Sequence, residues 1–180
     1  YLFIRILKET TIKDNFWNQM INAIIIGRGG STGLPGKNIM KILGRPLMHY
    51  PILAALNSKE VNNIYLSTDD KEIAAEGQKL GCKLIMRPKE LATKEALAEH
   101  AFIHAFHEIK KNTKEDMEAI VLLFCNGATL LSKYIDENAF RIRSEYLERR
   151  NELIFKLFPN FEKTLINECI LYGSSIIESN

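Results

Sequence analysis

Short apolar runs alternate along this chain with segments in which apolar positions recur at helical spacing. The runs are continuous rather than alternating with polar residues, which is typical of parallel strands buried on both faces. They predict four strands, at residues 22–26, 63–67, 83–86 and 119–124. Helices are predicted at 47–57 (with Pro51 in the first turn), 71–80 and 95–111, and a fourth begins with Ser132 as its cap. This order predicts an α/β fold with a mainly parallel sheet covered by helices on both faces.

The loops after the predicted strands are the places to look for chemistry, because ligands of such sheets bind outside the carboxyl ends of the strands. These loops are residues 27–45, 67–70, 87–96 and 125–131. In the second loop, Asp69 and Asp70 precede a helix that Gly81 is predicted to end as its C′ residue. The two aspartates have two interpretations: cap and first-turn acid of that helix, or contact to a ribose, a base or a metal-bound water.

Two segments lie outside the alternation of strands and helices. Residues 1–19 show no evident partner element, and Met20 stands directly before the first strand, so we hypothesise that 1–19 is an N-terminal extension of doubtful origin. Residues 20–140 hold the predicted strands and helices. Residues 141–180 form a divergent, helix-like segment in which the alternation fades, so we expect the sheet to be incomplete on its C-terminal side.

Composition narrows the class of protein. Of the 180 residues, 46% are hydrophobic and 26% charged, which excludes a disordered chain, a collagen and a disulfide scaffold. A net charge of +2 does not indicate a nucleic-acid partner, and no apolar run approaches the ~20 residues that cross a bilayer. Three widely spaced cysteines, an odd number, fit reduced thiols. We expect a cytoplasmic domain that binds neither nucleic acid nor membrane.

Glycine and charge are unevenly distributed. Five of the ten glycines lie within residues 27–36, and no carboxylate occurs between Asp14 and Glu60. Glycines allow backbone N–H groups to approach phosphate, while Arg28 offers a bidentate fork and Lys37 a point charge. The alternative is a glycine-rich surface turn with two solvated bases. The preceding strand and the lack of carboxylates favour phosphate binding.

Two common phosphate-binding loops do not fit this segment. A Walker A loop needs Ser or Thr after Gly-Lys, but Asn38 follows Lys37 here. In the dinucleotide fingerprint a third glycine would stand where Thr32 is, and Pro35 interrupts the helix that should follow. A dinucleotide-binding oxidoreductase is therefore the weaker alternative.

The loop resembles that of another family. Residues 28–38 read Arg-Gly-Gly-Ser-x-Gly-x-Pro-Gly-Lys-Asn, which is similar to the signature of CMP-sugar synthetases of the acylneuraminate cytidylyltransferase type. Three further motifs follow in that family's order: Gly-Arg-Pro-Leu at 44–47, Ser-Thr-Asp-Asp at 67–70 and Arg-Pro-Lys-Glu-Leu-Ala at 87–92. One such match would be unspecific, but four in the right order are specific.

The resemblance implies a Rossmann-like nucleotidyltransferase that transfers CMP from CTP to an acidic nine-carbon sugar and releases pyrophosphate. By that resemblance the catalytic residues are Arg28 and Lys37, which hold the triphosphate, and Arg87 reads the cytosine. The other nucleotide-binding residues it implies are Gly29, Gly30, Ser31, Thr32, Gly36, Asn38 and Ala96. It also implies Mg²⁺ as cofactor, CTP and an acidic sugar as partners, and a homodimer for the full-length family.

The sequence departs from the family pattern in places that bear on function. Thr32 stands where the family often has Lys, and residues 93–98 differ from the usual segment beside the base and ribose. After the fourth strand, Leu-Phe-Cys-Asn-Gly-Ala-Thr-Leu replaces the common Leu-Gln-Pro-Thr-Ser-Pro-Leu-Arg, so the sugar-side candidates Phe124, Asn126 and Thr129 suggest a different acceptor. Residues 141–180 contain no aspartate, so the family's metal-binding pair is not identified.

Other interpretations remain open at this point. The chain could use another nucleotide or sugar, or could be a truncated, non-catalytic CTP-binding remnant. His100, His104 and His107 share a helical face at a spacing that can bind zinc, although a partly exposed helix face explains them as well. His49 lies close to the glycine-rich loop in sequence and could contact phosphate.

Overall fold

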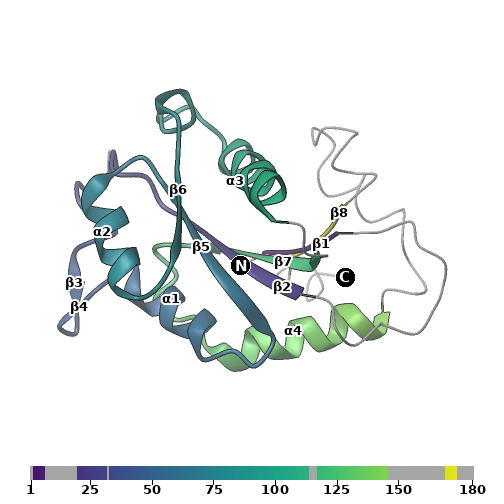
Figure 1. The fold of residues 1–180 in the computed structure, drawn as a ribbon. Helices are drawn as coiled ribbons and strands as arrows, with labels where there is room; N and C mark the ends of the chain where they lie inside the picture. The colour runs from purple at the N-terminus through teal and green to yellow at the C-terminus, as the bar shows by residue number, and fades with distance from the viewer. Residues whose placement is uncertain (1, 7–19, 32, 114–116, 146–168, 174–180) are drawn as a thin grey trace.

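A six-stranded sheet forms the centre of the computed structural model, which describes residues 2–6, 20–31, 33–113, 117–145 and 169–173 (Figure 1). The strand order is β6-β5-β2-β7-β1-β8. The bounds are β1 Leu2–Ile6, β2 Met20–Ile26, β5 Val61–Thr68, β6 Lys83–Met86, β7 Met117–Phe124 and β8 Cys169–Gly173. The strands β6, β5, β2 and β7 run parallel, whereas β1 runs antiparallel to both β7 and β8. The predicted mainly parallel sheet is therefore confirmed.

The helices follow the predicted order, with small shifts at their ends. They are α1 His49–Leu56, α2 Lys71–Lys79, α3 Ala98–Asn112 and α4 Ser132–Glu145, with a 3-10 turn η1 at Lys89–Leu91. Pro51 lies in the first turn of α1, where its missing N–H leaves no helical hydrogen bond unmade. Gly81 follows the end of α2 with φ +81°, the left-handed C′ conformation that favours glycine.

Three features were not predicted. The expectation that residues 1–19 hold no partner element is wrong, because β1 pairs with β7 through four registered residue pairs from Leu2↔Leu122 to Arg5↔Ala119. The second is β8, which pairs with β1 and lies within residues 141–180, where a helix-like segment was expected. The third is a short hairpin within the glycine-rich loop, formed by β3 Lys41–Ile42 and β4 Arg45–Pro46. The pairings of β1 with β7 and β8 join segments far apart in the chain, and local sequence patterns do not reveal such partners.

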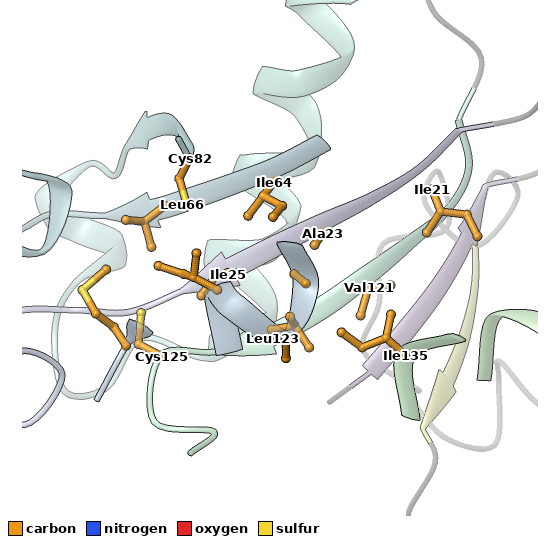
Figure 2. Packing of buried hydrophobic residues seen from close by; sticks show 14 of the residues in the cluster. Ile21, Ala23, Ile25, Ile64, Leu66, Cys82, Val121, Leu123, Cys125 and Ile135 are labelled. Carbon is orange, nitrogen blue, oxygen red and sulfur yellow. The ribbon is translucent and has the colours of Figure 1, made fainter. Parts of the chain in front are cut away.

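Helices cover both faces of the sheet, as the continuous apolar strands predict. Alternate residues of β2 divide between the faces: Ile21, Ala23 and Ile25 belong to one buried cluster, whereas Ile24 and Ile26 belong to the other. Figure 2 shows part of the first cluster, in which these β2 residues lie near Ile64 and Leu66 of β5 and Val121 and Leu123 of β7. The same cluster includes residues of α1, α2 and α4. The second cluster packs against α3. This two-sided core fixes the carboxyl ends of the parallel strands, where the site lies.

The helices in the described part of the chain are short. The longest, α3, has 15 residues, and no described helix has both the length and the apolar character needed to cross a membrane.

Candidate functional site

A cavity of about 270 Å³ lies at the carboxyl ends of the parallel strands, as the fold predicts. Its wall is built from the loop after β2, the loop after β6 and the turn after β7. The described residues that line it are Ile26, Gly27, Arg28, Ser31, Lys37, Asn38, Arg87, Leu91, Thr93, Lys94, Ala96, Leu97, Ala98, Ala101, Phe124, Cys125 and Asn126.

The wall of this cavity carries positive charge. Four of the lining side chains are cationic, namely Arg28, Lys37, Arg87 and Lys94, and none of the lining residues in the described part of the chain is a carboxylate. Fixed cations around a partly enclosed space concentrate the electrostatic field and attract anions. The cavity therefore has the charge that a polyphosphate requires.

Arg87 is held rigidly in the wall. Its side chain is only 8% exposed, its Nη2 donates to the carbonyl of Ser67 at 2.9 Å, and its backbone N–H donates to the carbonyl of Thr68 at 2.8 Å. Burial lowers the pKa of the guanidinium, and the nearby Asp69 carboxylate opposes that shift. Its side-chain hydrogen bonds go to the neutral Ser67, so no ion pair ties up the guanidinium in these bonds, although the Asp69 carboxylate lies nearby.

The glycine-rich loop is anchored to its neighbours at several points. At its start, the N–H of Gly27 donates to the carbonyl of Ser67 at 3.1 Å. The buried Asn38 side chain donates to the carbonyl of Arg28 at 3.0 Å, and Nη1 of Arg28 donates to the carbonyl of Thr93. Arg28 therefore connects the loop to the segment after β6 and closes one side of the cavity.

The cavity brings together most of the residues predicted from sequence. Arg28, Ser31, Lys37, Asn38, Arg87, Ala96, Phe124 and Asn126 line it. Gly29, Gly30, Gly36 and Thr129 do not, and Thr32 lies outside the described residues. Gly29, although it does not line the cavity, has its N–H hydrogen-bonded to Asp69 at 3.1 Å. The roles assigned to these residues stay predictions.

Among the lining residues that the sequence did not predict, Lys94 and Cys125 bear most on the chemistry of the cavity. Lys94 was noted only as part of a departure from the family pattern, yet it adds a fourth cation to the wall. Cys125 follows β7 and is 2% exposed, and burial raises the pKa of its thiol to about 12. Its position after a predicted buried strand was the signal that could have placed it at the cavity.

The two aspartates after β5 have different partners, which bears on the two interpretations given for them. Asp70 is the N-cap of α2, since its Oδ1 accepts from the N–H groups of Glu72 and Ile73 at 2.8 and 2.9 Å. Asp69 instead faces the glycine-rich loop and accepts from Gly29. The cap interpretation is thus confirmed for Asp70 alone.

None of the described histidines lines the cavity. His49 contacts Glu76, with Nε2 and Oε2 2.9 Å apart, so it joins α1 to α2, and this contact does not support the predicted phosphate role. On α3, His100 and His107 are exposed. Among the described residues, no group of three or more His, Cys, Asp or Glu side chains could hold a metal ion, so the zinc interpretation finds no support.

Comparison with known proteins decides the family. The family model for cytidylyltransferases matches residues 22–123, more than half of the chain. The chain belongs to the cytidylyltransferase family. The resemblance to acylneuraminate cytidylyltransferases, inferred from four motifs, is therefore confirmed.

Relatives of this cytidylyltransferase-family chain carry related names. A pseudaminic acid cytidylyltransferase of Campylobacter jejuni is 35% identical over 133 residues, covering 73% of this chain and 55% of the relative. An N-acylneuraminate cytidylyltransferase of Escherichia coli is 38% identical over 85 residues, covering 47% and 20%. A CMP-N,N'-diacetyllegionaminic acid synthase of Legionella pneumophila is 42% identical over 74 residues, covering 41% and 32%. The chain spans about half the length, or less, of these curated relatives.

Solved structures confirm the fold. The structure of CMP:2-keto-3-deoxy-manno-octonic acid synthetase complexed with CTP matches with a TM-score of 0.60 at 20% identity, covering 71% of this chain and 49% of that chain. A cytidylyltransferase from Leptospira borgpetersenii matches with a TM-score of 0.56 at 18% identity, covering 89% and 63%. At such identities the likeness shows the nucleotidyltransferase fold alone.

Proposed function

We propose that this chain binds CTP in the cationic cavity and transfers CMP to an acidic nine-carbon sugar, releasing pyrophosphate. One observation carries the proposal: Arg28, Lys37, Arg87 and Lys94 line a single cavity whose described wall contains no carboxylate. The names of the relatives support it, since they include pseudaminic acid and N-acylneuraminate cytidylyltransferases.

In this proposal, Arg28 and Lys37 bind the triphosphate. The sugar hydroxyl attacks the α-phosphorus, and its proton passes to water. The bond from that phosphorus to the bridging oxygen breaks, and pyrophosphate leaves with the electron pair. Such a transfer needs alignment and charge neutralisation more than covalent help from the protein. Arg28 suits the task, because its guanidinium can form a fork with phosphate while one nitrogen stays bonded to Thr93.

Arg87 supplies the preference for cytosine in this proposal. Cytosine presents O2 and N3 as hydrogen-bond acceptors, whereas uracil carries a hydrogen on N3. A guanidinium has donors and no acceptor, so it matches cytosine and meets uracil with two opposed donors. The bonds from Arg87 to Ser67 limit its movement, so the protein cannot easily adapt to the wrong base.

The acceptor sugar is proposed to contact the turn after β7. Phe124 is 40% exposed and Asn126 is also exposed, and both line the cavity with the cations. An apolar ring beside an amide can contact the carbon skeleton and the polar substituents of a sugar acid. Thr129 lies outside the lining, so Phe124 and Asn126 are the stronger sugar-side candidates.

Mg²⁺ is the proposed cofactor, and none of the steps of the transfer is assigned to it. Among the described residues, no group of three or more His, Cys, Asp or Glu side chains could hold a metal ion. The cations of the cavity are therefore the positive charges that the described part of the chain offers a triphosphate.

Two measurements on the full 180-residue chain test the proposal. Isothermal titration calorimetry should show binding of CTP at least ~10-fold tighter than UTP, the ratio that one mismatched hydrogen bond gives. Equal affinity for both would refute the role of Arg87. Pyrophosphate release should then be measured with CTP, Mg²⁺ and either pseudaminic or N-acetylneuraminic acid. Binding of CTP without release for any sugar acid would favour a non-catalytic, CTP-binding chain.

A further inference from the structure

Asp69 lies beside the cavity without lining it. It directly follows β5, and its Oδ1 accepts a hydrogen bond from the backbone N–H of Gly29 at 3.1 Å. Forty positions separate the two residues, so only the parallel pairing of β2 with β5 brings them together. The carboxylate therefore joins the loop after β5 to the glycine-rich loop after β2.

The opposite side of the same peptide unit is held as well. The N–H of Gly29 and the carbonyl of Arg28 belong to one peptide bond, and the carbonyl accepts from Nδ2 of Asn38 at 3.0 Å. A trans peptide is planar, and its N–H and C=O point in opposite directions. Two hydrogen bonds from opposite sides therefore fix the orientation of this plane.

We propose that Asp69 is a positioning residue that, together with Asn38, clamps the peptide plane between Arg28 and Gly29 and thereby sets how the Arg28 side chain enters the cavity. The inference rests on the proposed function, because Arg28 is assigned there to the triphosphate. It gives Asp69 a role distinct from that of its neighbour Asp70, which is engaged as the cap of α2. It also makes the side chain of Asn38 part of the clamp.

The orientation of this plane matters because the peptide plane starts at the Cα of Arg28. A rotation of the plane swings the Cα–Cβ bond, and the long side chain enlarges that movement at the guanidinium. Displacement of a positioning group by about 1 Å can cost on the order of 100-fold in function. The clamp holds the peptide plane in one orientation, so the fork of Arg28 is placed before the nucleotide arrives.

Matched substitutions separate the clamp from the negative charge. Asp69→Asn keeps an oxygen that can accept from Gly29, whereas Asp69→Ala removes the acceptor. We expect Asp69→Ala to weaken CTP binding ~10-fold or more, and Asp69→Asn to bind within about threefold of the unchanged chain. Glu72→Ala is the control, because Glu72 is an exposed carboxylate on the first turn of α2 and does not line the cavity.

A double-mutant cycle tests whether Asp69 acts through Arg28. In an Arg28→Ala background, Asp69→Ala should change CTP affinity by less than about threefold, because the side chain that the clamp orients is gone. A loss of equal size in both backgrounds would overturn the proposal, since it would indicate general damage to the loop. Asp69→Asn binding CTP as poorly as Asp69→Ala would also overturn it.

Amide hydrogen exchange at Gly29, followed by NMR without nucleotide, tests the clamp independently of CTP. We expect protection in the unchanged chain and in Asp69→Asn, and loss of protection in Asp69→Ala. Rapid exchange in the unchanged chain would overturn the clamp even if Asp69→Ala failed to fold. If the unchanged chain did not bind CTP, the proposed function would fail, and protection at Gly29 would decide the clamp by itself.

Discussion

A methyl group added at Gly29 offers the sharpest test of how the glycine-rich loop is packed. In Gly29→Ala the new Cβ would lie 2.9 Å from both Cβ and Cγ of Asp70, nearer than ordinary van der Waals contact. Asp70 cannot turn away freely, because its carboxylate caps α2 through the N–H groups of Glu72 and Ile73. The loop must therefore move away from the start of α2.

The size of the effect follows from these distances. To restore ordinary contact the loop must retreat by about 0.5 Å or more, which would lengthen the 3.1 Å bond from Gly29 to Asp69 beyond hydrogen-bonding range. Overpacking of this kind costs ~1–3 kcal/mol of folding free energy, partly offset by ~0.4–1 kcal/mol from the less flexible unfolded chain. We expect a net loss of ~1–2 kcal/mol and a ~10- to 100-fold weaker affinity for CTP.

Gly30→Ala is the matched control in the same loop, because a Cβ there meets no atom of the described residues within 4 Å. Urea unfolding would be measured for both variants, and calorimetric titration with CTP for Gly29→Ala. Gly30→Ala should retain the stability of the unchanged chain. If the two variants unfolded alike in urea, the close packing of Gly29 against α2 would be refuted.

Three further predictions follow from the site and its surroundings. Arg28→Ala should weaken CTP binding by ~10- to 100-fold in titration calorimetry, and Arg28→Lys should recover only part of the loss because it lacks the fork. The raised pKa of Cys125, about 12, keeps its thiol protonated, so peptide mapping should find it unmodified by iodoacetamide until denaturant is added. Hydrogen bonds from Lys79 and His49 lower the pKa of Glu76 below its ordinary 4.5. Its contribution to stability should therefore be present at neutral pH and disappear as the pH falls through the lowered value. Glu76→Gln should be less stable than the unchanged chain at about pH 7, and the difference should shrink as the pH is lowered below about 4, measured by urea unfolding.

Much of this fold could be predicted from the sequence because the signals are local. Continuous apolar runs identified β2, β5, β6 and β7 within a few residues at each end. The helical spacing, Asp70 and Gly81 located α2 to within one residue of its observed end. The hairpin of β3 and β4 was not predicted, because its strands of two residues are too short to show alternation.

In the candidate site, too, some residues could be predicted from local motifs, whereas other contacts depend on tertiary packing. The motifs predicted that Arg28, Lys37 and Arg87 belong to one site, and the order of the parallel strands explains why the loops after β2 and β6 converge there. His49 lies close to the loop in sequence, which suggested a contact with phosphate. The packing of α1 beside α2 gives it Glu76 as a partner instead.

The sequence by itself determined the parallel strands, the helices that cover them and the family motifs, since each depends on residues only a few positions apart. The tertiary structure alone decided which backbone groups those motifs hold. The clamp on the peptide between Arg28 and Gly29 uses Asp69, forty positions away, and it exists because β2 pairs with β5 in register. The pairing of β1 with β7 is equally non-local. Such contacts depend on the order and register of strands across the whole sheet, which no short stretch of sequence encodes.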